Sequence, residues 1–114
     1  MRPDEEIRLR HILDAAREAR GFVSGRSRED LNQDLQLEWA LVKAVEIIGE
    51  AACQMDAVSR AEVPDMPWED IMGMRHRLVH AYFDINLDIL WKTVHEDLPA
   101  LIAALEPMFR KRPE

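Results

Sequence analysis

The stretch PWEDIMGMRHRLVHAYFDINLDILWKTVHEDLPAL, residues 67–101, contains two apolar patterns with the period of an α-helix. In its first part, Ile71, Met74 and Leu78 recur at intervals of three and four residues. Residues at this spacing share one face of a helix, so the pattern predicts a helix over 68–79 with one buried side. No part of the chain alternates apolar and polar residues for long enough to predict a strand.

The second part of this stretch follows FDIN, in which Asp84 or Asn86 can cap a helix with its side chain. Large apolar residues then recur at helical spacing, namely Leu87, Leu90, Trp91, Val94, Leu98, Leu101, Ile102 and Leu105. Pro99 lies within this pattern. Because proline has no N–H to donate, it removes one backbone hydrogen bond, and we expect a kink there.

Two further helical patterns precede this stretch, over about 4–22 and about 31–58. The second of them carries two apolar stripes, one made of Leu35, Trp39, Val42, Val45, Gly49 and Ala52, the other of Leu37, Leu41, Ala44, Ile48, Ala51 and Met55. Two stripes on one helix predict burial on two sides, and one side needs a partner surface. The whole chain is therefore predicted to be all-α.

Length and composition indicate one globular domain of 114 residues, with a core over about 4–107 and a basic tail over 108–114. The single cysteine, Cys53, excludes an internal disulfide and a cysteine-based zinc site, and is expected to be a small buried residue. Trp39, Trp68 and Trp91 are expected to anchor the core. The chain shows neither a signal peptide nor an apolar run of about 20 residues, so we expect a soluble cytoplasmic protein without membrane contact.

The net charge of −7 opposes a broad electrostatic grip on nucleic acid and argues against duplex DNA as a target. The charge is uneven, however. Residues 71–83 contain no acidic side chain but hold Arg75, His76, Arg77 and His80. A local positive site of this kind suits a phosphate-bearing ligand or a brief encounter with RNA.

The residue types of this segment fit RNA cleavage without a metal ion or other cofactor. A histidine can move a proton near neutral pH, and an arginine stays charged and holds phosphate oxygens. His80 could take the proton from a ribose 2′-OH while Arg75 stabilises the phosphate that the 2′-oxygen attacks. A second proton donor would help the leaving 5′-oxygen, and His76 could serve as that donor or could change the cleavage preference. RNA supplies its own nucleophile, so no serine or cysteine is needed.

The spacing of Arg75 and His80 has a structural consequence. Five residues along a helix place two side chains about 140° apart, so one continuous helix cannot aim both at one phosphate. Either the helix ends near Val79 or another subunit completes the site, and a two-fold dimer would satisfy the second possibility.

Simpler interpretations remain for each of these residues. Arg75 and His80 could be structural or solvated, and Tyr82 is, on spacing alone, a core-edge residue. His76 and His80 are four residues apart and could ligate a metal, with Asp84 or His95 as a further ligand.

The 67–101 segment resembles the C-terminal half of HepT-like proteins of the HEPN superfamily, and VEIIGEAA, Val45 to Ala52, resembles their second helix. The similarity runs over nearly the whole chain. HEPN proteins carry an arginine, a polar residue, three more residues and a histidine, a pattern that Arg75, His76 and His80 fill. The HepT branch adds a tyrosine two positions later, which is Tyr82 here. The branch more often has Asn or Asp where this chain has His76.

The resemblance implies a four-helix up-and-down HEPN bundle with a short extra helix or turn, assembled as a two-fold homodimer. It implies an RNA endonuclease of a toxin–antitoxin pair, with a composite site at the dimer interface formed by Arg75, His76 and His80. It also implies a partner, a minimal nucleotidyltransferase antitoxin that attaches AMP to Tyr82 and silences the toxin.

Two other functions stay open at this point. The same fold could be a non-catalytic interaction module that binds a nucleotidyltransferase or a nucleotide, because fold does not fix function. Less favoured is a metal-dependent phosphohydrolase that uses His76 and His80. Activity in EDTA separates the last possibility from a metal-free ribonuclease.

Overall fold

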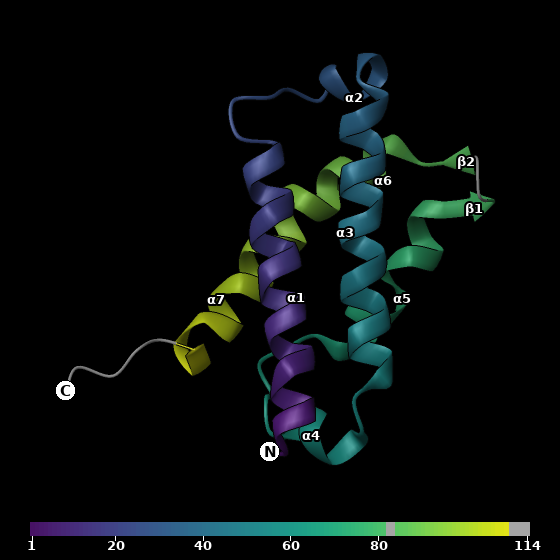
Figure 1. The fold of residues 1–114 in the computed structure, drawn as a ribbon. Coiled ribbons are helices and arrows are strands. Elements are labelled where there is room, and N and C mark those ends of the chain that lie inside the picture. Colours follow the sequence, from purple (N-terminus) through teal and green to yellow (C-terminus); the bar gives the residue numbers. More distant parts are fainter. Residues whose placement is uncertain (82–83, 110–114) are drawn as a thin grey trace.

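The computed structural model describes residues 1–81 and 84–109, with backbone alone for 79–81. Its helices are α1 Pro3–Phe22, α2 Asp30–Gln33, α3 Leu35–Gln54, α4 Ala57–Ala61, α5 Trp68–Leu78, α6 Leu87–Lys92 and α7 Leu98–Phe109, and two short strands, β1 Val79–Ala81 and β2 Asp84–Ile85, separate α5 from α6. Tyr82 and residues 110–114 of the basic tail lie outside the described residues. The expected all-α class is confirmed, because the two strands form only a small hairpin beside the helices (Figure 1).

The long elements form an up-and-down bundle around one apolar core (Figure 1). α1 packs against α3 and α7, and α3 packs against α5. The largest fully buried side chains come from all of these helices and include Leu9, Ile12, Leu13, Leu41, Ile48, Ile71, Met74, Leu78, Leu90, Leu98 and Leu101. The positions predicted at helical spacing on α5, α6 and α7 thus supply much of the core.

The second predicted helix, over about 31–58, is wrong as a single element, because capping residues divide it. Asp34 Oδ1 accepts a hydrogen bond from the N–H of Leu37 at 3.1 Å and starts α3, and Asp56 Oδ1 accepts one from Ser59 at 2.8 Å and starts α4. Aspartate favours this N-cap position, since its carboxylate satisfies an N–H that the helix leaves free. The apolar pattern continues through both caps and so concealed them.

The third predicted helix is confirmed as α5, but the expectation that the chain has no strand is wrong. β1 and β2 pair antiparallel, with Val79 opposite Ile85 and Ala81 opposite Asp84. Strands of three and two residues are too short to show an alternating pattern, and only the return of the chain brings them together. Asn86 N–H donates to the Leu78 carbonyl at 2.8 Å and closes the base of this hairpin.

The sequence predicts a kink at Pro99; in the described structure Pro99 lies near the start of α7, two residues after a π-helical turn, Thr93–Asp97, that separates α6 from α7. Here the N–H of Leu98 donates to the carbonyl of Thr93, five residues back. A widened turn accommodates a proline that cannot donate to the carbonyl four residues before it. Arg20 on α1 donates to the carbonyl of Val94 at 3.3 Å and ties α1 to this turn.

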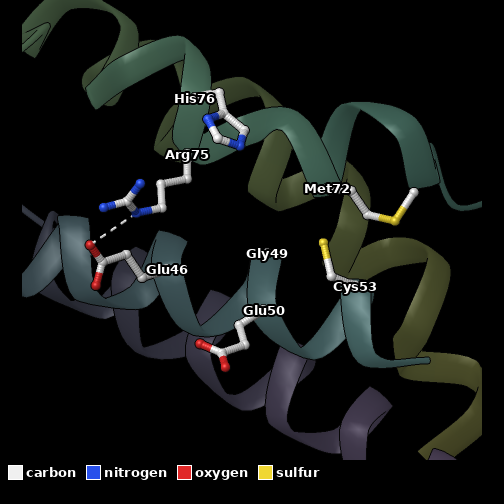
Figure 2. A pocket seen from close by; sticks show the side chains of 7 residues that line it. All are labelled: Glu46, Gly49, Glu50, Cys53, Met72, Arg75 and His76. Carbon is white, nitrogen blue, oxygen red and sulfur yellow. Dashed lines mark hydrogen bonds and ion pairs between the residues drawn. The ribbon is translucent and has the colours of Figure 1, made fainter. Parts of the chain in front are cut away.

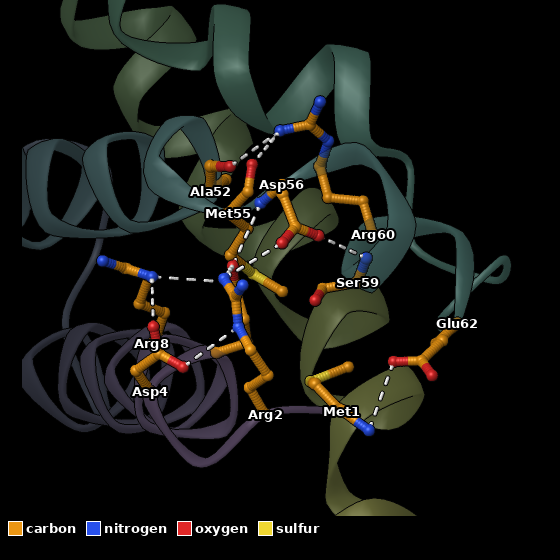
Figure 3. Close-up of polar contacts among 11 residues, drawn as sticks. Met1, Arg2, Asp4, Arg8, Ala52, Met55, Asp56, Ser59, Arg60 and Glu62 are labelled. Carbon is orange, nitrogen blue, oxygen red and sulfur yellow. Dashed lines mark hydrogen bonds and ion pairs between the residues drawn. The ribbon is translucent and has the colours of Figure 1, made fainter.

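Polar contacts join the start of α1 to the connection between α3 and α4 (Figure 3). Arg2 lies 3.2 Å from the buried carboxylate of Glu5 and 3.1 Å from that of Asp56. The N–H of Asp56 also donates to Glu5 Oε1 at 3.2 Å. These bonds satisfy Oε1 of Glu5 and join α1 to the end of α3, while Oε2 accepts no hydrogen bond and lies 3.6 Å from Arg8.

Within residues 1–81 and 84–109, every helix is too short or too polar to cross a membrane.

Candidate functional site

The last turn of α5 positions the candidate residues Arg75 and His76. One face of this helix buries Ile71, Met74 and Leu78, so the positions between them must face outward. Both Arg75 and His76 are exposed in the described structure. The apolar spacing that defined the helix therefore also decides that its basic residues reach solvent.

Arg75 and His76 line a pocket of about 250 Å³ between α3 and α5 (Figure 2). The other lining residues are Glu46, Gly49, Glu50, Cys53 and Met72. Gly49 lies where the helices approach closely, since a Cβ built on it would be 3.6 Å from the carbonyl oxygen of Ile71. A small residue at this point brings the α3 carboxylates within reach of the α5 cations.

Cys53 was expected to be buried, and this prediction is wrong: its side chain is exposed and its sulfur points into the pocket (Figure 2). The small and apolar neighbours in AACQM suggested a core position. Its neighbours Ala51 and Ala52 are buried, but Cys53 falls on the α3 face that α5 leaves open.

The guanidinium of Arg75 forms an ion pair with Glu46, with 3.3 Å between Nε and Oε1 (Figure 2). Both side chains are partly accessible, at 47% and 36%. The local positive site that the sequence suggested is thus a site of mixed charge, because α3 brings acidic groups to it. Sequence reasoning missed Glu46, although the residue lies in the VEIIGEAA motif.

His80 lies on β1, two residues beyond the end of α5. The helix therefore ends before His80, which confirms one of the two solutions to the 140° separation from Arg75. The structure brings Arg75 and His76 together at one pocket. The side chain of His80 and the whole of Tyr82 fall outside the described residues.

One apolar surface on α3 lies uncovered in the described chain. Leu35 and Trp39 are exposed to 57% and 63%, whereas Val45 of the same predicted stripe is fully buried. The prediction that Trp39 anchors the core is wrong, while Trp68 and Trp91 are partly buried against the core. Trp39 and Glu46 are seven residues apart and so lie within about 20° on the same helix face.

The residues described here offer no cluster of three or more His, Cys, Asp or Glu side chains that could hold a metal ion. The side chain of His80 lies outside the described residues, so a metal site formed by His76 and His80 is not tested here. His95, proposed as a further ligand, instead stacks on Trp91 with 3.9 Å between ring centroids and bonds to its carbonyl oxygen.

The helical bundle, with Arg75 and His76 at the end of its third long helix, is consistent with the HEPN class that the sequence resembles. Residues 12–108 match the Ribonuclease HepT-like family. The chain belongs to this family.

Several proteins are similar to this chain over most of their own length. A protein named "Probable ribonuclease HepT" from Thermococcus cleftensis is 39% identical over 80 residues, which is 70% of this chain and 73% of that protein. Two others, from Caldanaerobacter subterraneus and Methanocaldococcus jannaschii, carry names that assign them provisionally as RNases. They are 36% and 32% identical over 103 residues, and they align to 90% of this chain and to 92% and 94% of their own. No solved structure shows a significant similarity.

Proposed function

We propose that this chain is an endoribonuclease that cleaves RNA without a metal ion, with Arg75, His76 and His80 as its catalytic residues. The observation that carries the proposal is the exposed Arg75–His76 pair at an open pocket, three residues before the start of β1, the strand on which His80 lies. Membership of the family and the ribonuclease names of its relatives support the same activity.

The reaction uses the 2′-OH of the substrate as its nucleophile. His80 removes the proton from this hydroxyl, and the 2′-oxygen attacks the adjacent phosphorus. Arg75 stabilises the added negative charge on the phosphate oxygens. His76 gives a proton to the departing 5′-oxygen, so the products carry a 2′,3′-cyclic phosphate and a 5′-OH.

The proposed enzyme is a two-fold homodimer with its site near the interface. Leu35 and Trp39 form an exposed apolar surface on the α3 face that also carries Glu46. Exposed aromatic side chains of this kind are typical anchors of protein interfaces. In a two-fold dimer both copies use the same surface, and because this surface shares its α3 face with Glu46, the partner of Arg75, a partner copy here would lie close to the Arg75–His80 motif.

The proposed biological role is that of a toxin whose antitoxin is a minimal nucleotidyltransferase. In this scheme the hydroxyl of Tyr82 attacks the α-phosphate of ATP, forms a phosphodiester to AMP and releases pyrophosphate. The added nucleotide places bulk and negative charge two residues from His80, where the RNA phosphate must bind. This role rests on the position of Tyr82 in the family motif.

Incubation of the purified protein with a single-stranded RNA in EDTA tests the activity. Cleavage that persists in EDTA and yields 2′,3′-cyclic phosphate ends supports the proposal, and His80→Ala should abolish it. Cleavage that stops in EDTA indicates a metal-dependent phosphohydrolase. A wild-type protein that binds RNA or nucleotide but cleaves nothing indicates a non-catalytic module.

A further inference from the structure

We infer that Glu46 is a positioning residue, which orients the guanidinium of Arg75 toward the phosphate of the RNA. This inference rests on the proposed function and names a residue that acts through Arg75, without contact to the substrate. It starts from the ion pair between Arg75 Nε and Glu46 Oε1 at 3.3 Å.

The choice of nitrogen atom matters in this pair. A guanidinium carries Nε on the chain side and two terminal nitrogens at its end, and each edge can hold two oxygens. Glu46 occupies Nε. Neither terminal nitrogen forms a hydrogen bond or ion pair with a described residue, so both can bind phosphate oxygens. The carboxylate thus holds the inner part of the group and leaves its outer edge for the substrate.

Without this contact, Arg75 would lack a fixed direction. Its side chain is 47% exposed, and no other ion pair or hydrogen bond engages it among the described residues. An arginine side chain on an open surface samples many rotamers, and fixing one of them costs conformational entropy. Glu46 selects a rotamer before RNA arrives, so part of that cost is met during folding.

Glu46 is itself held by the packing of α3. Its neighbours Val45 and Gly49 are buried. Gly49 lies at the contact between α3 and Ile71 on α5. Because the two helices are antiparallel, Glu46, about one turn before Gly49, and Arg75, about one turn after Ile71, lie on the same side of that contact (Figure 2). The distance between the Cα atoms of Glu46 and Arg75 is therefore fixed by the core.

A structural role alone does not explain the pair. Partly exposed ion pairs contribute little to stability. Removal of the carboxylate should then leave the melting temperature unchanged and act on catalysis. The alternative is that Glu46 competes with the phosphate for Arg75, in which case its removal would accelerate cleavage. The two roles give kinetic effects of opposite sign.

Steady-state kinetics of RNA cleavage by Glu46→Ala and Glu46→Gln test the inference. Glutamine keeps an oxygen that can accept from Nε, and alanine does not. We expect Glu46→Ala to lower kcat by about tenfold or more, since misplacement by about 1 Å can cost about 100-fold, and Glu46→Gln to restore most of the loss. Tm should change little. The matched control is Glu38→Ala on the same helix, whose carboxylate has no ion pair within the described residues.

An unchanged or raised kcat in Glu46→Ala would overturn the inference, and so would a Gln variant as slow as the Ala variant. A second readout needs no cleavage. The ¹H–¹⁵N NMR signal of Arg75 Nε, assigned by its loss in Arg75→Lys, should move toward free arginine in Glu46→Ala and stay in Glu46→Gln. If the chemical shift of the Arg75 Nε signal is the same in Glu46→Ala as in the wild type, the inference is refuted.

The NMR measurement also separates this inference from the proposed function. If the wild type cleaves no RNA, the proposed nuclease fails. In that case, binding of a 2′-O-methyl oligoribonucleotide reports on Glu46. Weaker binding by Glu46→Ala than by Glu46→Gln still supports the positioning role at Arg75, and equal binding refutes it.

Discussion

The N–H of Asn86 donates to the carbonyl oxygen of Leu78 with 2.8 Å between the two atoms. This bond joins the last residue of α5 to the residue before α6 and closes the hairpin that carries His80. The side chain of Asn86 also caps α6, since Oδ1 accepts from the N–H of Ile89 at 3.0 Å. One residue thus fixes both the base of the hairpin after α5 and the start of α6.

Asn86→Ala should lower the free energy of unfolding by about 1 kcal/mol, the usual cost of a lost N-cap. RNA cleavage should fall as well, because the base of the hairpin becomes less well fixed. Urea denaturation and a cleavage assay measure the two effects. Asn86→Asp is the control, since aspartate caps equally well and should stay close to wild type. Equal stability of the Ala and Asp variants would contradict the assignment of the cap.

His80→Ala should reduce cleavage by about 10²–10⁴-fold, the range for a lost acid–base group, and Arg75→Ala by about 10²–10³-fold, the range for a lost donor that stabilises transition-state charge. Their melting temperatures should match that of the wild type. Arg77→Ala removes the same charge from the same turn, but Arg77 donates to the carbonyl of Asp70 at 3.0 Å and does not line the pocket. It should therefore retain most of its activity. Similar losses in Arg75→Ala and Arg77→Ala would assign the effect to charge alone.

Trp39→Glu should convert a dimer into a monomer. Light scattering of the wild type should give twice the chain mass of 13.2 kDa, and the variant should give the chain mass itself. Val58→Glu is the matched control, because Val58 is 75% exposed on α4, away from the Leu35–Trp39 surface. A monomeric wild type at micromolar concentration would refute the dimer. A Trp39→Glu variant that remains dimeric would show that the dimer interface lies on another surface.

Acid should destabilise the fold through Asp34. Arg26 donates to its carboxylate at 2.8 Å, the N–H of Leu37 donates at 3.1 Å, and these bonds lower the pKa of Asp34. Since the pKa is lower in the folded than in the unfolded state, the folded state binds fewer protons. The stabilisation is complete above the unfolded pKa of about 4 and is lost as the pH falls through the folded pKa.

Thermal melts from about pH 7 to about pH 2 check this dependence. Asp34→Asn keeps a side chain that can cap α3 but cannot ionise. The variant should melt at a lower temperature than the wild type at pH 7, and its melting temperature should fall less on acidification. Parallel curves for the two proteins would show that Asp34 makes no contribution to acid sensitivity.

Tyr82→Phe tests the regulatory part of the proposed function. If Tyr82 accepts AMP, the variant should keep its nuclease activity and escape silencing by a co-expressed nucleotidyltransferase. If its hydroxyl is structural, the variant should lose about 1 kcal/mol of stability and remain silenced. Mass spectrometry of the co-expressed wild type locates the modification. An adenylyl group on another residue would refute the assignment.

Much of the fold could be predicted from local pattern. The spacing of Ile71, Met74 and Leu78 gave the buried face of α5, and that face left Arg75 and His76 in solvent. Pro99 marked the irregular turn of the last long helix. These features depend on residues within a few positions of each other, so the local sequence pattern is enough to predict them.

Only the tertiary structure decided which distant groups meet. Glu46 precedes Arg75 by 29 positions, and their ion pair exists because α3 packs against α5 at Gly49. Likewise, both stripes of α3 are apolar in sequence, and the packing of α1 and α5 determines that Val45 is covered while Trp39 is not. The amino-acid sequence by itself determined the buried faces of the long helices and the position of the Arg75–His80 motif. The tertiary structure determined the partner of the arginine and the free apolar surface, because both depend on how helix faces pair across the core.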